Sequence, residues 1–261
     1  MTALGAHSSR LTRLRRLVRD RRYRDGEGAV VVEGPHAIGT ALDCGVEFEA
    51  LYISHGAASD EVVDAADEAG VEIMFGDRET LDEIADAGTP QGVLAVVRPR
   101  VVVLDEVVAH RRVVMLDAVQ DPGNAGAIVR TAAAAGFDAV IGGTGTADLW
   151  SPKAIRGSAG TVFALDIVRR VDTADALRSL GEAGHVRWAA TADGEYAYDE
   201  VSDDASSQEA LTLVLGSEAH GVSPAGLAEI DRGVRIPMAE PVESLNVAVT
   251  AGILLYQLRV R

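Results

Sequence analysis

Three short polar segments, each placed after an apolar stretch, hold the residues of this chain that could do chemistry. The first runs from Asp121 to Arg130, and its Asn124 lies six residues before Arg130. If Asn124 caps a helix, Arg130 lies nearly two turns into that helix. Such a turn places side chains and backbone N–H groups at the carboxyl end of a strand, where α/β proteins bind ligands. A strand followed by a capped helix is also a common structure, so this segment alone leaves both interpretations open.

The second segment runs from Gly216 to Ser223 and again follows an apolar stretch. Gly216 and Gly221 permit close approach of the backbone to a ligand. Glu218 could accept hydrogen bonds or cap a helix. An ordinary turn would explain the same residues equally well.

The third segment combines Ile236-Pro237-Met238 with the run from Glu243 to Val249. Ser244 or Asn246 could cap the last helix of the chain. Taken as structure alone, a capped C-terminal helix accounts for this segment.

The elements that must position these residues follow from apolar periodicity, which predicts alternating strands and helices typical of the α/β class. The expected strands cover residues 29–34, 51–54, 71–75, 92–97, 112–119, 139–142, 166–171, 186–190, 211–215 and 234–236. The expected helices cover residues 11–18, 35–42, 60–69, 78–87, 124–135, 151–159, 173–182 and 245–259, and the acidic, serine-rich stretch 196–209 is expected to be a loop.

The best candidate for a linker follows the strand expected at 92–97. Pro99 interrupts the extended stretch there, between Arg98 and Arg100. We therefore expect an α/β domain over residues 1–98, a linker over 99–109 and a second α/β domain over 110–261.

The charge of the chain is distributed unevenly. The formal net charge is −16, yet residues 1–24 hold eight arginines against the single acid Asp20, giving +7 there and −23 elsewhere. The spacing of Leu11, Leu14 and Leu17 predicts an amphipathic helix with arginines on its outer face. That helix could lie along a phosphate backbone, through Arg13, Arg16, Arg22 and Arg24, or it could be a solvated charged helix.

Several classes of protein are not expected. No apolar stretch approaches the roughly 20 residues that cross a bilayer, and no secretory signal is apparent. Cys44 is the single cysteine, and the six histidines show no metal-ligand spacing. We expect a cytoplasmic protein without disulfides, membrane contact or a metal site.

Together the three segments, in this order and at these separations, resemble the signature motifs of the SpoU (TrmH-like) class of the SPOUT superfamily of methyltransferases. The motifs are N-x5-R, G-S-E-x-x-G-x-S, and I-P-M with S-L-N-V. The N-terminal part is similar to the L30e-like RNA-binding domain of that family, including Val32-Glu33-Gly34 and the run from Thr89 to Ala95. The resemblance covers nearly the whole chain and implies an N-terminal L30e-like α/β domain followed by a SPOUT domain with a deep trefoil knot.

The resemblance implies an enzyme that moves a methyl group from S-adenosylmethionine to a ribose 2′-hydroxyl of RNA. The cofactor would lie among the knot loops in a bent form, held mainly by backbone atoms. The residues implied at the cofactor are Gly216, Ile236 and Leu245, with Met238, Glu218 and Ser244 lining the same pocket. The family forms homodimers in which the first-motif arginine, here Arg130, faces the partner's cofactor. The separate N-terminal domain favours ribosomal RNA over transfer RNA as the substrate.

The catalytic residues implied by the resemblance are Arg130, Asn124, Glu218, Ser244 and Asn246. Methyl transfer is an in-line displacement, so the protein must align the 2′-oxygen with the methyl carbon and help to remove the hydroxyl proton. A guanidinium stays protonated because its pKa lies above about 12. We therefore expect Arg130 to clamp a substrate phosphate and to stabilise the developing alkoxide, and not to act as a literal base.

Three other functions remain as alternatives at this point. A nicotinamide dehydrogenase would need G-x-G-x-x-G at the start of a helix, which neither the segment 121–124 nor the segment 142–145 supplies. A non-catalytic RNA-binding protein could keep the same fold, although Asn124, Arg130 and Glu218 are all present. A methyltransferase acting on transfer RNA would carry the same motifs.

Overall fold

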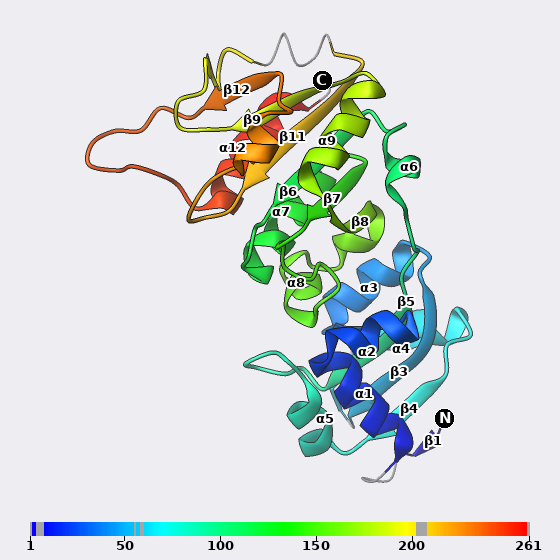
Figure 1. Cartoon of the computed structure of the whole chain (residues 1–261). Coiled ribbons are helices and arrows are strands. Elements are labelled where there is room, and N and C mark those ends of the chain that lie inside the picture. Colours follow the sequence, from blue (N-terminus) through cyan, green and yellow to red (C-terminus); the bar gives the residue numbers. More distant parts are fainter. Residues whose placement is uncertain (1, 4–7, 55, 58–59, 202–207, 260–261) are drawn as a thin grey trace. The chain divides into compact units, whose positions relative to one another are not determined.

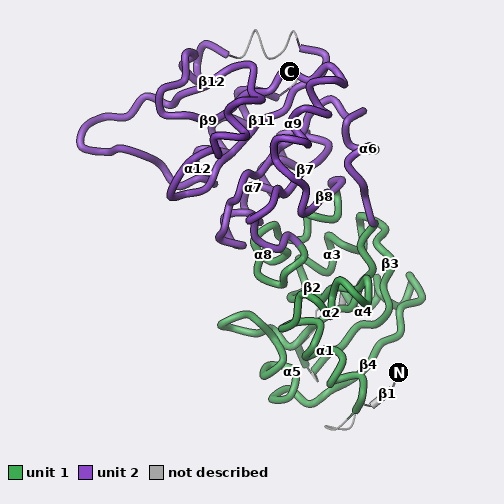
Figure 2. The backbone as a smooth tube through the Cα atoms, viewed as in Figure 1, with its two compact units in different colours: residues 1–100, 150–164 green, residues 101–149, 165–261 purple. Residues whose placement is uncertain are grey.

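Two sheets, one in each of two compact units, organise the chain in the computed structural model (Figures 1 and 2). The structure describes residues 2–3, 8–54, 56–57, 60–201 and 208–259. The first unit comprises residues 1–100 and 150–164, and the second comprises residues 101–149 and 165–261. Residues 150–164 thus belong to the first unit although their neighbours in sequence belong to the second.

The first unit contains a mixed five-stranded sheet in the order β1-β4-β3-β5-β2. The strand β5 runs antiparallel to both β2 and β3, whereas β3 and β4 are parallel. Its elements are β1 (Thr2–Ala3), α1 (Ser9–Arg19), α2 (Arg21–Glu27), β2 (Val30–Glu33), α3 (Pro35–Asp43), β3 (Glu47–Ser54), α4 (Asp60–Glu68), β4 (Ile73–Gly76), α5 (Arg78–Ile84), β5 (Val93–Arg98), α8 (Pro152–Gly157) and the 3-10 helix η1 (Thr161–Ala164).

The arginine-rich helix α1 forms as its apolar spacing predicts. Ser8 caps it by accepting a hydrogen bond from the backbone of Arg10, at 3.2 Å. Leu11, Leu14 and Leu17 are buried in a core that also contains side chains of β3, β4, α5 and β5. The helix is therefore part of the core of its unit.

The second unit contains a seven-stranded parallel sheet in the order β10-β12-β9-β11-β6-β7-β8. Its central strands β6, β7 and β11 are almost entirely buried and mainly apolar, as is typical of strands covered on both faces. Its elements are α6 (Leu104–Val107), β6 (Arg112–Asp117), α7 (Pro122–Ala134), β7 (Ala139–Gly143), β8 (Asp166–Val171), α9 (Thr173–Glu182), β9 (His185–Ala190), β10 (Tyr196–Ala197), β11 (Ala210–Gly216), α11 (Pro224–Leu227), β12 (Arg232–Arg235) and α12 (Val247–Leu258).

The order of strands places two connections side by side. β6 and β11 are neighbours, with Asp117 opposite Gly216 at their carboxyl ends. From β6 the chain continues toward β7 on one side, and from β11 it continues toward β12 on the other. A point where neighbouring connections diverge in this way is where open α/β sheets bind ligands.

Several local expectations differ from the structure. The cap of α7 is Asp121, whose carboxylate accepts from the backbone of Asn124 at 2.9 Å, so Asn124 lies inside the first turn and does not cap the helix. Helix α6 lies within the stretch expected to be a linker. The expected loop 196–209 begins with the two-residue strand β10, and its residues 202–207 lie outside the described part of the chain.

Candidate active site

A cavity of about 850 Å³ opens at the carboxyl edge of the parallel sheet. Because all strands of this sheet point the same way, the segments that follow β9, β11 and β12 meet at one edge. The lining residues are Ala190–Asp193, Leu215–Glu218, His220–Val222, Leu227, Val234–Met238, Glu243–Val247, Thr250 and Leu254. Its volume lies in the range of about 300–1,000 Å³ typical of small-molecule sites.

Seven of the residues that the resemblance implies at the cofactor or in catalysis line this one cavity. They are Gly216, Glu218, Ile236, Met238, Ser244, Leu245 and Asn246. The second and third sequence segments therefore form a single site, although residues 224–235 separate them along the chain.

Asn124 and Asn246 join the first segment to the other two through hydrogen bonds between side chains. The amide of Asn124 donates to Glu218 Oε1 at 2.8 Å, and its Oδ1 accepts from the amide of Asn246 at 3.1 Å. Asn246 also caps α12, because its Oδ1 accepts from the backbone N–H groups of Ala248 and Val249. One chain of hydrogen bonds thus connects the starts of α7 and α12 with the turn after β11.

Glu218 is held as an acceptor. Burial alone would raise the pKa of Glu218, but hydrogen bonds from the Asn124 side chain and from backbone N–H groups outweigh it and hold the pKa below its usual value. A carboxylate with a lowered pKa is a weak proton acceptor at neutral pH. Glu218 is therefore suited to fixing Asn124 and not to removing a proton.

The turn from Gly216 to Ser223, here called the cofactor turn, is closed by its own backbone. Ser217 and Gly221 exchange two backbone hydrogen bonds of 2.9 Å. A side chain at Gly216 would collide with the backbone of Gly221 and Val222, since a Cβ there would lie within 2.2 Å of three of its atoms. Glycine is required at position 216 because the chain folds back onto it.

Arg235 fixes a further wall of the cavity that the sequence analysis did not single out. Its Nη1 donates to the carbonyl oxygens of Gly194 at 2.6 Å and Glu195 at 2.8 Å. These bonds hold the segment after β9 beside β12, where Gly194 packs directly on the backbone of Gly233. The position of Arg235, directly before the I-P-M motif, is the signal in the sequence that could have identified it.

Arg130 lies apart from the cavity formed by its own chain. It is exposed on α7 and is not among the residues that line the cavity. Helix α7 packs against α12, which carries the exposed apolar side chains of Val249 and Tyr256. Arg130 and these two apolar side chains are therefore exposed on helices that pack against each other.

The four arginines expected at RNA differ in their surroundings. Arg13 is engaged by Glu27 at 2.9 Å and Glu49 at 2.7 Å. Arg16 and Arg22 are exposed, and the guanidinium of Arg16 lies 3.7 Å from the ring centroid of Tyr23. The acids that pair with this helix come from other elements of the unit, which the local sequence did not reveal.

The prediction that Arg24 contacts RNA disagrees with its placement. Arg24 is 6% exposed, and its guanidinium donates to the carbonyl oxygens of Leu17 at 2.8 Å and Val18 at 3.0 Å. Free carbonyls at the end of a helix need donors, and Arg24 supplies them for α1. Its role is to join α2 to the end of α1.

The described residues provide neither a membrane-spanning helix nor a cluster of metal ligands. In residues 2–3, 8–54, 56–57, 60–201 and 208–259, no helix is both long and apolar enough to cross a bilayer. Within the same ranges, no three or more histidine, cysteine or acidic side chains are grouped so that they could hold a metal ion.

Comparison with known proteins gives matches over both units. Residues 111–256 match the model of the SpoU rRNA methylase family, and residues 31–101 match that of the RNA 2′-O ribose methyltransferase substrate-binding domain. A similar protein is the 23S rRNA (guanosine(2553)-2′-O)-methyltransferase RlmP of Bacillus subtilis, which is 34% identical over 88% of each chain.

Solved structures give the same result for the fold. The AdoMet-bound rRNA methyltransferase from Sinorhizobium meliloti superposes with a TM-score of 0.85 at 27% identity, covering 98% of this chain and 97% of the other. The SpoU methyltransferase AviRb from Streptomyces viridochromogenes, solved with AdoMet, gives a TM-score of 0.83 at 27% identity over 96% of this chain and 97% of the other.

Proposed function

Since the chain belongs to the SpoU rRNA methylase family, we propose that it transfers a methyl group from S-adenosylmethionine to a ribose 2′-hydroxyl of ribosomal RNA. The observation that carries this proposal is the convergence of the second and third segments on one cavity, to which Asn124 of the first segment is joined by hydrogen bonds with Glu218 and Asn246. RlmP and the Sinorhizobium enzyme both act on ribosomal RNA by name, which favours that substrate over transfer RNA.

The cavity suits S-adenosylmethionine in size and in charge. Apolar side chains such as Leu215, Ile236 and Leu254 line it beside the bare backbone of Gly216. The lining contains three carboxylates, of Asp193, Glu218 and Glu243, and one guanidinium, that of Arg235. A surplus of negative charge favours a ligand with a positive sulfonium. An elongated ligand with an apolar ring and several polar groups fits this combination.

Bound S-adenosylmethionine supplies an electrophilic methyl group, and the chain's own residues supply the positioning. Asn246 and Ser244 lie at the start of α12 on the rim of the cavity, where they can hold the ribose. Asn124 is oriented by Glu218 and cannot rotate without breaking two hydrogen bonds. Holding the 2′-oxygen in line with the methyl carbon is the main contribution we assign to these residues.

We assign to Arg130 the recognition of a substrate phosphate next to the reacting ribose. Its planar fork can hold two phosphate oxygens at once, and its positive charge stabilises the oxyanion that forms as the hydroxyl proton leaves. Because Arg130 lies outside its own cavity and is exposed, we propose that it serves the cavity of a second copy in a homodimer. The exposed Val249 and Tyr256 on the adjacent helix support an interface there.

The same proposal includes a knot in the second unit, the type of the first unit and the location of the protein in the cell. A deep trefoil knot in the second unit is consistent with a cavity built from loops that end in α12, which lies against α7 and β11. An L30e-like first unit is supported by the match of residues 31–101 to a substrate-binding domain. A protein that modifies ribosomal RNA must meet that RNA, so we propose a cytoplasmic location.

Mapping of 2′-O-methylated nucleotides tests the proposal in cells. Ribosomal RNA from cells with and without the gene is compared position by position. We expect one ribose methylation to disappear on deletion and to return when the wild-type gene is restored, but not when Arg130→Ala is supplied. Loss of a methyl group from transfer RNA instead would identify the other substrate.

A further inference from the structure

We propose that Asp117 is a positioning residue that fixes the far end of the cofactor turn and thereby sets the affinity for the cofactor. The proposal rests on the function proposed above, which places S-adenosylmethionine at that turn. Asp117 ends β6, directly opposite Gly216, and precedes the first sequence segment by only a few residues.

The surroundings of Asp117 leave little room for its carboxylate to move. The residue is 4% exposed. Its Oδ1 accepts from the hydroxyl of Thr173 at 2.8 Å, and its Oδ2 accepts from the backbone N–H of Ser223 at 2.6 Å. Neither partner is a cation, so the carboxylate depends on these two donors for the loss of its hydration.

The far end of the cofactor turn depends on this carboxylate. The near end, Gly216, is already held by the pairing of β11 with β6, and the middle is closed by the Ser217–Gly221 bonds. Beyond Gly221 the chain bends toward α11, and Oδ2 of Asp117 is the acceptor that holds Ser223 there. Gly221 and Val222 line the cavity, so a shift of Ser223 would displace part of its wall.

The backbone after Asp117 is bent into an unusual conformation. Ala118 has φ of 58°, in the left-handed region that residues with a Cβ rarely adopt. After this bend, the backbone N–H of Gln120 reaches Glu218 Oε2 at 3.4 Å. The short segment from Asp117 to Gln120 therefore contacts the cofactor turn at two places, Ser223 and Glu218. Strain of this kind persists where the surrounding structure requires the conformation.

Thr173 provides a matched control within the same hydrogen-bonded group. It begins α9 on the other side of Asp117, is 7% exposed and does not line the cavity. Thr173→Val removes the hydroxyl with little change in shape and leaves the Ser223 bond intact. If Asp117 only stabilised the fold, Asp117→Ala and Thr173→Val would change the affinity for S-adenosylmethionine to the same extent. If Asp117 positions the cofactor turn, only Asp117→Ala weakens binding.

Calorimetric titration of the full-length protein with S-adenosylmethionine tests the proposal. We expect Asp117→Ala to weaken binding about tenfold, since it leaves the Ser223 N–H without its acceptor. Asp117→Asn should bind within about twofold of the wild type, because Oδ1 still accepts from Ser223 while the amide donates to the Thr173 hydroxyl. Thr173→Val should lower the melting temperature but also bind within about twofold. In steady-state assays, KM for S-adenosylmethionine should rise in Asp117→Ala with kcat nearly kept.

Equal affinities in Asp117→Ala and the wild type would overturn the proposal, as would an equal loss of affinity in Thr173→Val. If Asp117→Ala does not fold, Ser223→Pro removes the same N–H at a φ of −62° that proline accepts, and Ser223→Ala keeps it. Both variants lose the serine cap of α11, so tenfold weaker binding in Ser223→Pro alone supports the proposal and equal binding in the two contradicts it. A wild-type protein that binds no S-adenosylmethionine would refute the proposed function itself, and the role of Asp117 with it.

Discussion

Asn124 can link the three segments because an amide both donates and accepts hydrogen bonds. It donates to Glu218 and accepts from Asn246, each on a different segment. An aspartate at this position would accept only and would face the Glu218 carboxylate, and an alanine would do neither. The side-chain chemistry at position 124 therefore explains how residues about 90 and 120 positions away are held beside it.

Replacement of Arg130 by lysine tests the phosphate clamp. Arg130→Lys keeps the charge but loses the planar fork, so we expect kcat to fall by about 100-fold while the affinity for S-adenosylmethionine is unchanged. Arg111→Lys is the matched control, because Arg111 is also exposed but precedes β6, at the opposite edge of the sheet from the cavity. The measurement is the methyl-transfer rate of the two variants on the same RNA. Near-normal turnover of Arg130→Lys would contradict the role of Arg130 in holding a substrate phosphate.

The sequence identified the residues of the site better than their partners. Gly216 and Glu218 could be singled out by their types after a strand and Asn246 as a possible helix cap, whereas Met238 was implied only by the resemblance to the SpoU class. Asp117 could not be, because an aspartate at the end of an apolar strand has no distinctive spacing. Its importance comes from Ser223, more than 100 residues away, which only the fold brings close.

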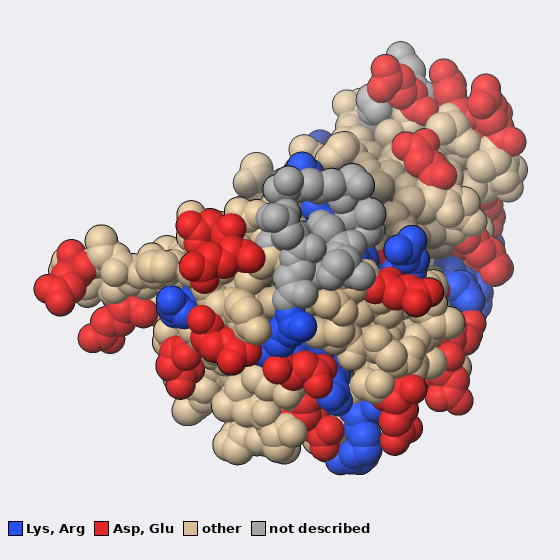
Figure 3. Space-filling view, turned by 90° about the horizontal axis from the view of Figure 1, so that it is seen from above, with Lys and Arg blue, Asp and Glu red and all other residues tan. Residues whose placement is uncertain are grey.

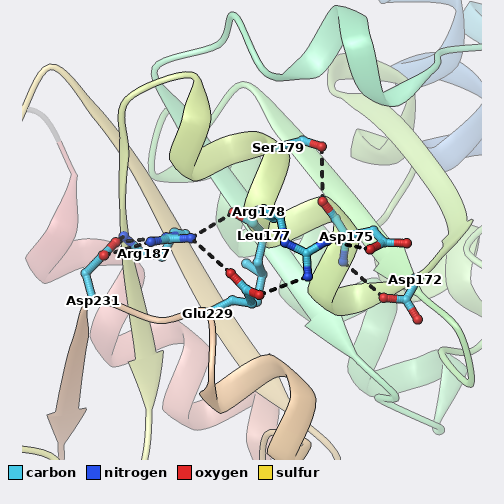
Figure 4. A network of polar contacts seen from close by, with 8 residues as sticks. All are labelled: Asp172, Asp175, Leu177, Arg178, Ser179, Arg187, Glu229 and Asp231. Atoms are coloured by element: carbon cyan, nitrogen blue, oxygen red, sulfur yellow. Dashed lines mark hydrogen bonds and ion pairs between the residues drawn. The ribbon is translucent and has the colours of Figure 1, made fainter.

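At the scale of elements, a network of charged side chains fastens α9, β9 and the turn before β12 to one another (Figure 4). Arg187 of β9 pairs with Asp231 through two nitrogens, at 2.9 and 2.8 Å, and donates to the carbonyl of Leu177 on α9. Arg178 on α9 reaches Asp175 and Glu229 from the solvent side. The hydrogen bond from Arg187 holds the pKa of Asp231 below its usual value.

The two arginines of this network should differ in their contribution to stability. The side chain of Arg187 is 16% exposed and that of Arg178 is 52% exposed. We expect Arg187→Ala to lower the free energy of unfolding by about 2 kcal/mol, because it leaves partly buried acceptors unpaired. Arg178→Ala should lower it by less than about 1 kcal/mol, as is usual for exposed ion pairs. Urea unfolding of both variants measures the difference, and equal losses would contradict this ranking.

A buried histidine makes the stability of the second unit depend on pH. His185, at the start of β9, is 4% exposed, and burial holds its pKa below its usual value. Its Nε2 lies 3.2 Å from the carbonyl of Val108, which can only accept, so Nε2 carries the proton and Nδ1 accepts from Thr212 at 2.9 Å. The folded protein therefore prefers the uncharged ring.

The direction of the pH effect follows from proton uptake. Below about pH 6.5 the unfolded chain gains a proton on this histidine while the folded chain resists it, so stability is full above that pH and falls as the pH drops through it. We expect the melting temperature of the wild type to fall between pH 7 and 5 more steeply than that of His185→Gln. His36→Gln, at an exposed position of the first unit, should keep the wild-type slope. If the melting temperatures of the wild type and of His185→Gln fall equally with pH, His185 is not the source of the pH dependence.

Elements with a clear apolar periodicity were predictable from the sequence, whereas several short ones, such as α2, α6 and α11, were not. Helix α1 and strands β6 and β11 appear as expected because their apolar spacing matches the face that they bury. Helix α2 was missed because Gly26 and charged residues hide its periodicity, and it is held by contacts such as that of Arg24 with α1. Helix α8 was expected, but its packing against β2 of the first unit depends on Arg156, which pairs with the distant Glu33 and Asp86.

At the scale of the whole molecule, a chain of net charge −16 must still bind a polyanion. Figure 3 shows acidic side chains spread over the face that it draws, with lysine and arginine in smaller groups. The loop between β12 and α12 carries the exposed Glu240 and Glu243. RNA binding must therefore depend on local positive groups, since the overall field opposes it.

Arg16 and Arg22 are the remaining candidates among the four arginines expected at RNA, because both are exposed while Arg13 is engaged by acids and Arg24 is buried. Deleting residues 1–24 would remove the buried leucines of α1, so point substitutions are the better test. We expect the pair Arg16→Ser and Arg22→Ser to weaken RNA binding and to lower the salt slope of log affinity by roughly one per arginine. Arg178→Ser, at an exposed site of the second unit, is the control, and an unchanged slope in the double variant would exclude this surface.

The fate of a labelled methyl group tests the central claim most directly. Purified protein is incubated with methyl-labelled S-adenosylmethionine and ribosomal RNA from cells that lack the gene, and the RNA is then digested to nucleosides and analysed by mass spectrometry. We predict that the label appears on the ribose 2′-oxygen of one nucleoside and that Arg130→Lys abolishes most of it. Label on a base, or none in ribosomal RNA, would contradict the account.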